Sequence, residues 1–283
     1  RRTILAGGIG RYADWNGTID HTQPFTASGN VRGRVIAHHQ GGKTFIDRER
    51  VNQDTLYGVI DADLTDSTRL SGGISYQQDK RRAAMWGGLP AFLDDGSLAD
   101  WPTDKNAAPD WVRWNNKTTN YFLEGSQKIG DDWEVSLKAN QRHGQGDSKL
   151  FYISGNSVNR ADGLGWSASP GKFNVDSKQT NIQLQTSGKY RLWGQTYDFT
   201  AGIQYNRRNT TSQAATIDYG NLPASATSTT GTAATPNPPG AQAASNTTTP
   251  SRKTASTPPP ACALPTGSAS SPEPASATGR VKA

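Results

Sequence analysis

The sequence predicts an all-β protein, an antiparallel up-and-down meander that forms part of a transmembrane β-barrel and is followed by a disordered tail. Three observations support this: side chains that alternate between apolar and polar, connections that alternate between short and long, and a change of composition near residue 220. Only 33% of the 283 residues are hydrophobic, against about 45–50% in a typical globular chain. No apolar run approaches the roughly 18 residues that a membrane-spanning helix needs, which argues against a helix bundle.

The clearest strand signals are three segments in which apolar and polar residues strictly alternate. They read WEVSLKAN at 133–140, TNIQLQ at 180–185 and YDFTAGIQY at 197–205. A period of two places one set of side chains on each face of a sheet. Weaker signals predict six more strands, at 4–9, 16–21, 31–38, 56–64, 70–77 and 120–128. The total is about nine strands, with no convincing amphipathic helix.

The predicted connections differ in length from one end of the meander to the other. Short turns rich in Gly, Asp and Asn fall at 26–30, 65–67, 130–132 and 190–194, and longer irregular segments at 40–54, 78–117 and 141–178. Outer-membrane barrels show this asymmetry. Alternation alone would also fit a soluble sandwich. Strands near the 9–11 residues of a tilted membrane strand, and aromatic residues at strand ends (Tyr121, Trp133, Tyr197, Tyr205), favour the barrel.

Composition divides the chain into a barrel region, 1–219, and a tail, 220–283. From Asn221 onward there are 11 of the 16 prolines and no aromatic residue, so the tail buries too little apolar surface to offset its ordering entropy. We therefore expect it to be disordered. The single cysteine, Cys262, excludes a disulfide framework. The net charge of +6 is spread along the chain, which argues against a nucleic-acid partner.

An ordered series of segments resembles one known family. It comprises GNVRGRV at 29–35, FIDR at 45–48, LYGVIDADLT at 56–65, the strand at 70–77, PDWVRW at 109–114 and LGW at 164–166. The series resembles the barrel of TonB-dependent siderophore receptors, nearest to those for ferripyoverdine and ferric hydroxamates, over residues 3 to about 206.

The resemblance implies a protein of the bacterial outer membrane, embedded in the lipid bilayer. Its expected role is to bind an iron–siderophore complex for import, with energy supplied through a plug domain by the inner-membrane partner TonB. Receptors of this class have 22 strands, so we expect a fragment without the plug and the C-terminal strands. Because unpaired strand edges are costly in lipid, we expect this chain alone not to transport.

The expected siderophore-binding residues are Trp86, Trp114, Arg113 and Tyr152. By the resemblance, Trp86 and Trp114 align with tryptophans that line the siderophore pocket. A third would fall near Ser157, and Tyr152 is the nearby substitute. Arg113 lies between Trp111 and Trp114. Stacking side chains with a few polar groups suit a compact, polar ligand. The alternative is that these tryptophans belong to an aromatic girdle at the membrane interface. Trp101 and Trp166 are weaker candidates.

Neither a metal site nor catalysis is expected. His38 and His39 are adjacent on a predicted strand, so their side chains point to opposite faces. In the family, iron arrives already chelated, so no cofactor is expected. The sequence contains no catalytic motif, which predicts that the protein is not an enzyme. Two alternatives remain open: a soluble carbohydrate-binding β module that uses exposed tryptophans, and a non-functional truncated product.

Overall fold

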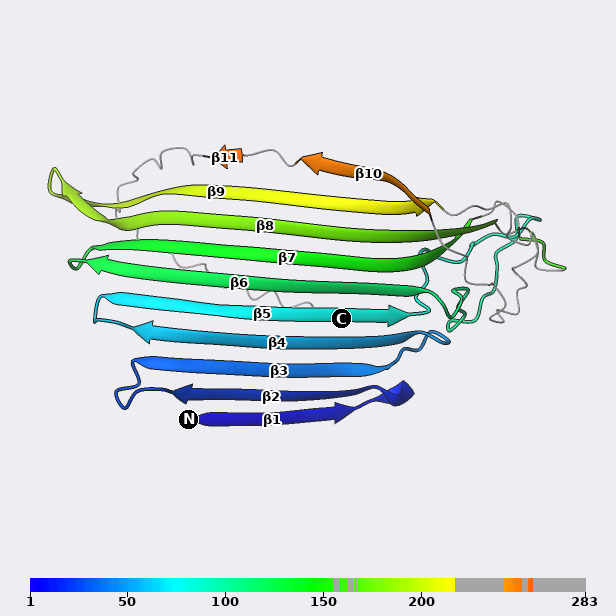
Figure 1. Cartoon of the computed structure of the whole chain (residues 1–283), viewed down its shortest axis with the longest axis horizontal. Helices are drawn as coiled ribbons and strands as arrows, with labels where there is room; N and C mark the ends of the chain where they lie inside the picture. Colours follow the sequence, from blue (N-terminus) through cyan, green and yellow to red (C-terminus); the bar gives the residue numbers. More distant parts are fainter. Residues whose placement is uncertain (155–157, 162–164, 166, 217–241, 251–253, 257–283) are drawn as a thin grey trace, which may run out of the picture.

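The computed structural model describes residues 1–154, 158–161, 165, 167–216, 242–250 and 254–256. Eleven strands form a single antiparallel sheet in which β1 to β10 follow one another in order and β11 lies beside β9 (Figure 1). The only other element in this part of the chain is a short 3₁₀ turn, η1 (Arg11–Ala13). No helix among the described residues has the length and apolar character needed to cross a membrane. The strands are β1 (Arg2–Ile9), β2 (Trp15–Pro24), β3 (Val31–Lys43), β4 (Arg50–Asp63), β5 (Thr68–Arg82), β6 (Arg113–Ile129), β7 (Trp133–Ser154), β8 (Ser167–Leu192), β9 (Gln195–Thr216), β10 (Gln242–Pro250) and β11 (Thr254–Ser256).

Each of the nine predicted strands coincides with one of β1 to β9, although the strand predicted at 56–64 runs one residue past the end of β4, so the predicted meander is confirmed. The predicted lengths were wrong, because the strands run from 8 residues in β1 to 26 in β8. The long connections shrink accordingly, to 44–49, 83–112 and the segment between β7 and β8. Beyond the apolar stretch both faces of a strand are polar, so apolar and polar side chains no longer alternate. The hydrogen bonds between neighbouring strands nevertheless continue.

The tail contributes two short strands, which the prediction of a disordered tail did not include. β10 pairs with β9 from Gln242 opposite Thr216 to Pro250 opposite Asn209. β11 pairs with β9 further along, from Thr254 opposite Asn206. The predicted boundary at 219/220 lies outside the described residues and stays a prediction.

The register gathers apolar side chains on one face of the sheet. Cross-strand partners share a face, and Leu137 is opposite Leu184, which is opposite Ile203. The same face carries Leu5, Ile19, Leu56, Ile74 and Leu123 on the strands before them. We call this the outer face and its opposite the inner face.

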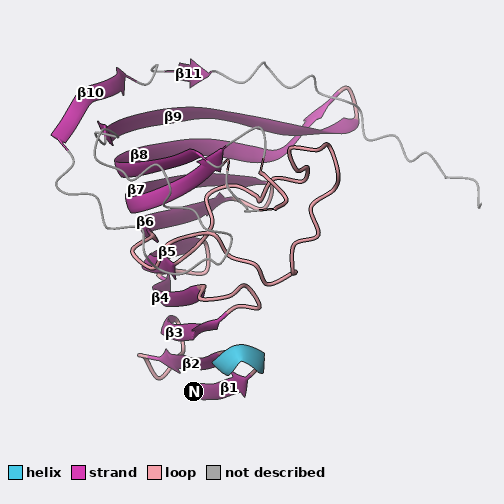
Figure 2. Ribbon diagram, turned by 90° about the vertical axis from the view of Figure 1, so that its right-hand side faces the viewer, coloured by secondary structure: helices cyan, strands magenta, loops and turns pink. Residues whose placement is uncertain are grey.

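The outer face is apolar and uncovered. Leu56 is 52% exposed and Ile203 63% exposed, and no second layer packs against this face in the described part of the chain (Figure 2). Leaving such side chains in water forgoes about 1.5–3 kcal/mol each. The apolar face that was predicted to contact lipid is therefore present and uncovered in the described part of the chain, and it is not the covered face of a sandwich.

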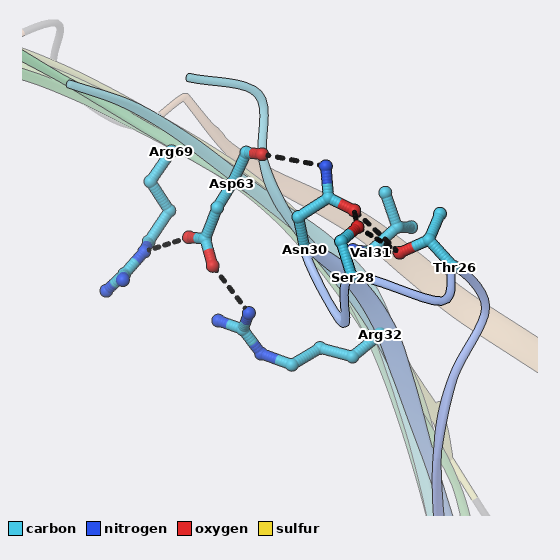
Figure 3. A network of polar contacts seen from close by, with 7 residues as sticks. All are labelled: Thr26, Ser28, Asn30, Val31, Arg32, Asp63 and Arg69. Atoms are coloured by element: carbon cyan, nitrogen blue, oxygen red, sulfur yellow. Dashed lines mark hydrogen bonds and ion pairs between the residues drawn. The ribbon is translucent and has the colours of Figure 1, made fainter. Parts of the chain in front are cut away.

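The two ends of the sheet differ as predicted. Tight turns close one end, with glycines at positive φ in three of them: Gly29 (75°), Gly130 (61°) and Gly194 (76°). In the turn between β2 and β3, Asn30 Oδ1 accepts hydrogen bonds from the hydroxyls of Thr26 and Ser28, both at 2.6 Å (Figure 3). The long loops lie together at the other end, on the right of Figure 1.

Charged side chains at the tight-turn end are joined on the inner face. The carboxylate of Asp63 pairs with Arg32 at 2.6 Å and with Arg69 at 2.7 Å, as Figure 3 shows. These three residues come from β4, β3 and β5. The ion pairs therefore join three consecutive strands next to their turns, and the inner face is polar where the outer face is apolar.

Candidate ligand-binding site

The long loop 83–112 is fixed to the sheet by a small apolar core. Ala108, Val112 and Phe151 are at most 3% exposed and pack together. Trp111 contacts Phe151 edge to face, with ring centroids 5.9 Å apart. Phe151 belongs to β7, so this core attaches the end of the loop to the sheet.

A buried amide connects this loop with the shorter loop 44–49. Asn106 is 2% exposed, and its Nδ2 donates to the carbonyl oxygens of Asp47 at 2.6 Å and Ala83 at 2.8 Å. Its Oδ1 accepts from the Ala108 amide at 2.8 Å. Arg48 adds an Nη2 hydrogen bond to the Asn106 carbonyl oxygen at 2.8 Å. Since buried polar groups are costly when unpaired, these contacts hold both loops in one arrangement.

Loop 83–112 also contacts the segment between β7 and β8. Leu93 forms a parallel β-bridge with Val158, which is 1% exposed. Asp95 accepts hydrogen bonds from the Ser97 side chain and amide, and pairs with Arg160 at 3.2 Å. These interactions, chiefly the Ser97 hydroxyl, lower the pKa of the Asp95 carboxyl below its usual value. The long loops therefore form one connected layer.

Trp86 lies within an aromatic group at this end. Its ring contacts Tyr152 at a centroid distance of 5.9 Å and Phe173 at 5.3 Å, both edge to face. Gly87, with φ of +115°, allows this approach, because a Cβ there would lie 2.6 Å from Tyr152 Cε2. Trp86 is half-buried, while Tyr152 is 42% exposed. The group thus combines a fixed ring with a ring that is accessible from solvent.

Trp114 shares the inner face with this group. It is opposite Ser148 on β7, and Ser148 is opposite Phe173 on β8. Two strand spacings of about 4.8 Å each separate the Trp114 and Phe173 backbones. The structure therefore brings three of the four predicted residues, Trp86, Trp114 and Tyr152, to the same face and the same end of the sheet.

Arg113 does not join them. It precedes Trp114 on β6, so its side chain points to the outer face. There Nη2 pairs with Asp147 Oδ2 at 3.0 Å. The sequence placed Arg113 and Trp114 together, but the strand extends through both residues and separates them.

The other aromatic candidates occupy different positions. The Trp101 indole N–H donates to the Pro90 carbonyl oxygen at 2.7 Å, within the long loop. Trp166 and Ser157 lie outside the described residues. Phe173 was missed because it lies in a segment predicted to be a loop, although KFNV at 172–175 alternates weakly.

Other aromatic residues lie near both ends of the outer face, where an aromatic girdle is expected. On the outer face, Trp15 contacts His39 at 4.5 Å near the long-loop end, and Trp133 contacts Phe199 at 5.7 Å near the tight turns. Aromatic belts of this kind mark the two membrane–water interfaces. The girdle interpretation therefore fits Trp15 and Trp133, whereas Trp86 and Trp114 belong to the inner face.

The two adjacent histidines point to opposite faces, as predicted. His38 Nδ1 is 2.7 Å from the Thr18 hydroxyl on the inner face. His39 Nδ1 is 2.6 Å from Asp54 Oδ1 on the outer face. In the described part of the chain, no cluster of three or more His, Cys, Asp or Glu side chains is arranged to hold a metal ion.

Comparison with known proteins finds sequences similar to this chain. No family model matches the chain. It is 30% identical over 226 residues to the ferric-pyoverdine BN7/BN8 receptor of Pseudomonas putida, an alignment covering 78% of this chain and 28% of that receptor. It is also 30% identical over 208 residues to the ferric-pyoverdine 358 receptor of the same species, covering 72% of this chain and 25% of that receptor. The chain thus spans about a quarter of the length of these relatives.

Solved structures give the same fold. The crystal structure of the outer-membrane ferripyoverdine receptor of Pseudomonas aeruginosa, bound to ferripyoverdine, matches with a TM-score of 0.70 and 22% identity, over 78% of this chain and 28% of that one. The ferric-catecholate import receptor Fiu of E. coli matches with a TM-score of 0.67 and 15% identity, over 78% of this chain and 33% of that one. The described sheet therefore has the fold of part of the barrel of these receptors.

Proposed function

We propose, from the premise that this chain is a partial β-barrel of the TonB-dependent siderophore-receptor class in the bacterial outer membrane, that its long-loop end helps to bind an iron–siderophore complex for import. The relatives' names identify them as ferric-pyoverdine receptors. We extend that role to the protein that carries this chain. Its activity is thus binding and transport, and its partners are a ferric siderophore and the lipid bilayer.

The observation that carries this proposal is the aromatic group on the inner face. Trp86 is fixed against Tyr152 and Phe173, while Tyr152 stays accessible at 42% exposure. A fixed aromatic surface with a polar hydroxyl at its edge suits a compact ligand that has an aromatic part and many polar groups. We propose Trp86, Trp114 and Tyr152 as ligand contacts, and leave out Arg113, which pairs with Asp147 on the outer face.

Import requires more than the part of the barrel wall that this sheet forms. In the class that the chain resembles, a plug inside the barrel responds to the TonB complex, and none of β1 to β9 supplies a plug. We propose that the inner face of the sheet contacts this plug, with the Asp63 ion pairs nearest the tight-turn end. The chain then contributes the wall and part of the binding site.

The test measures the affinity of the outer-membrane protein that carries this chain, purified in detergent, for ferripyoverdine and for a ferric hydroxamate. Trp86→Ala, Trp114→Ala and Tyr152→Ala should each weaken binding of one of these at least tenfold, as expected for a central aromatic contact. Trp15→Ala, on the outer face, and Arg113→Gln serve as controls and should change affinity less than twofold. Unchanged affinity for every ferric siderophore in the Trp86, Trp114 and Tyr152 variants would contradict the proposed site.

A further inference from the structure

Arg81 is the cationic neighbour of Trp114 on the inner face. The register places Arg81 of β5 directly opposite Trp114 of β6. The side chains of directly opposite residues share a face of the sheet, and their Cβ atoms lie about 4.5–5.5 Å apart. Arg82 follows on the strand, so its side chain points to the outer face. The sequence predicted Arg113 as the cation beside this tryptophan, whereas the pairing of the strands supplies Arg81.

The side chain of Arg81 is held at its inner end by two polar neighbours. Its Nε donates to Asp79 Oδ1 at 3.3 Å, and Asp79 Oδ2 accepts a hydrogen bond from Gln53 Nε2 at 2.9 Å. Gln53 lies on β4 directly opposite Asp79. A side chain that is already restrained loses less entropy when it binds a ligand. These contacts therefore prepare Arg81 for binding.

The outer end of the guanidinium is available to a ligand. Asp79 engages the Nε–H of Arg81, and the two Nη groups form no hydrogen bond with any residue that the structure describes. The Arg81 side chain is 45% exposed. A guanidinium presents paired N–H groups that match the two oxygens of a carboxylate. Arg81 can therefore bind a carboxylate next to the Trp114 ring.

The surrounding part of the inner face carries a surplus of positive charge. We define the long-loop half of this face by the inner-facing positions within 73–82, 114–122, 140–152, 169–181 and 206–214. In these described ranges the inner-facing cations are Arg81, Arg142 and Arg208, and the inner-facing carboxylate is Asp79. Three positive charges and one negative charge leave a net charge of +2 on this half of the face.

The surplus charge and the aromatic group favour the same kind of ligand. Charge complementarity suppresses binding of the wrong partner more than it adds affinity for the right one. Trp86, Trp114 and Tyr152 offer stacking surface, and Arg81 adds a fixed cation at the side of that surface. The site therefore suits a ligand that combines an aromatic part with a free carboxylate.

We propose that Arg81 binds a carboxylate of the ferric siderophore, and that the site thereby selects chelates with a free carboxylate over neutral chelates of the same shape. The inference rests on the proposed function, because it specifies the ligand chemistry of the same site. Arg81 then has the role that the sequence analysis gave to Arg113, whose side chain pairs with Asp147 on the outer face.

The test compares ferripyoverdine with the same chelate after its free carboxylates have been converted to amides, using the detergent-purified protein that carries this chain. The unmodified protein should bind the carboxylate form at least tenfold more tightly, as expected for a hydrogen bond between charged groups. Arg81→Gln should lose this preference through weaker binding of the carboxylate form alone, and Arg81→Glu should reverse it. The matched control, Arg82→Gln, removes the same charge from the next residue and should keep the preference within twofold.

The preference is a ratio of two affinities measured on one protein sample, so partial unfolding of a variant does not change it. Equal affinity of the unmodified protein for both forms, or an unchanged preference in Arg81→Gln, would overturn the inference. The proposed function would then stand if Trp86→Ala weakens binding of both forms alike. Failure of the unmodified protein to bind either form would also overturn the inference, and binding of a ferric hydroxamate by the same sample would show whether the proposed function fails with it.

Discussion

Trp86 meets Tyr152 edge to face, with ring centroids 5.9 Å apart, and this contact joins the longest loop to the far end of β7. Gly87 makes the contact possible through its positive φ and its missing side chain. Gly87→Ala should therefore displace the Tyr152 ring and destabilise the loop by about 1–3 kcal/mol. The measurement is the tryptophan fluorescence of the folded protein together with its urea unfolding.

Gly88 provides the matched control for this substitution. A Cβ at Gly88 would meet no atom within 4 Å, so Gly88→Ala should leave both the fluorescence and the unfolding midpoint unchanged. Equal effects of the two substitutions would show that the loop does not depend on the Trp86–Tyr152 contact.

Asn106→Ala should release loop 83–112 from loop 44–49, which the Asn106 amide connects. The substitution leaves the Asp47 and Ala83 carbonyl oxygens and the Ala108 amide without their partner, at a cost of about 1–3 kcal/mol or more. Trypsin should then cleave after Lys105 at least fivefold faster than in the unmodified protein. Exposed Asn209→Ala is the control, and equal cleavage rates in both variants would contradict the role of Asn106.

The contact between Asp95 and Arg160 should depend on pH. Hydrogen bonds from Ser97 and the charge of Arg160 lower the pKa of Asp95 in the folded protein. The stabilisation is therefore fully present above the ordinary carboxyl pKa of the unfolded chain, and it is lost as pH falls through the lower, folded pKa. Hydrogen exchange of the Ser97 amide should be faster in Asp95→Asn than in the unmodified protein at pH 7. The difference should vanish in acid, and a difference that grows in acid would reverse the assigned sign.

A charged side chain introduced on the outer face should destabilise the protein in a lipid bilayer. Leu137 is central on this face, opposite Leu184, so Leu137→Arg should destabilise the inserted protein by about 2–4 kcal/mol. The neighbouring Ser136 lies on the inner face, and Ser136→Arg should cost less than about 1 kcal/mol, as is usual for a substitution on a solvated surface. Urea titration of the protein refolded into phosphatidylcholine vesicles distinguishes the two, and equal losses would mean that both faces see the same solvent.

The sequence predicted the strands wherever one face is apolar. Only there do apolar and polar side chains alternate and so reveal the extended backbone. The alternation that marks the strand around Ile182 is absent around Gly146 and weak around Phe173. Both faces of the extended strands are polar over much of these stretches, so these strand ends were predicted as loops. The tryptophan positions came from family resemblance, but the partners of Trp86 depend on how loop 83–112 folds back onto the wall. The face of Arg113 depended on the extent of β6, which the sequence pattern did not determine.

The central claim is that the outer face contacts lipid and the inner face lines a solvated interior. Its most direct test is a nitroxide scan of residues 133–140 in bilayers, on a Cys262→Ser background, with oxygen and a water-soluble nickel chelate as relaxing agents. We predict that oxygen accessibility peaks at Val135, Leu137 and Ala139, and that nickel accessibility peaks at Glu134, Ser136 and Lys138. Accessibility without a period of two, or with the peaks exchanged, would contradict the account.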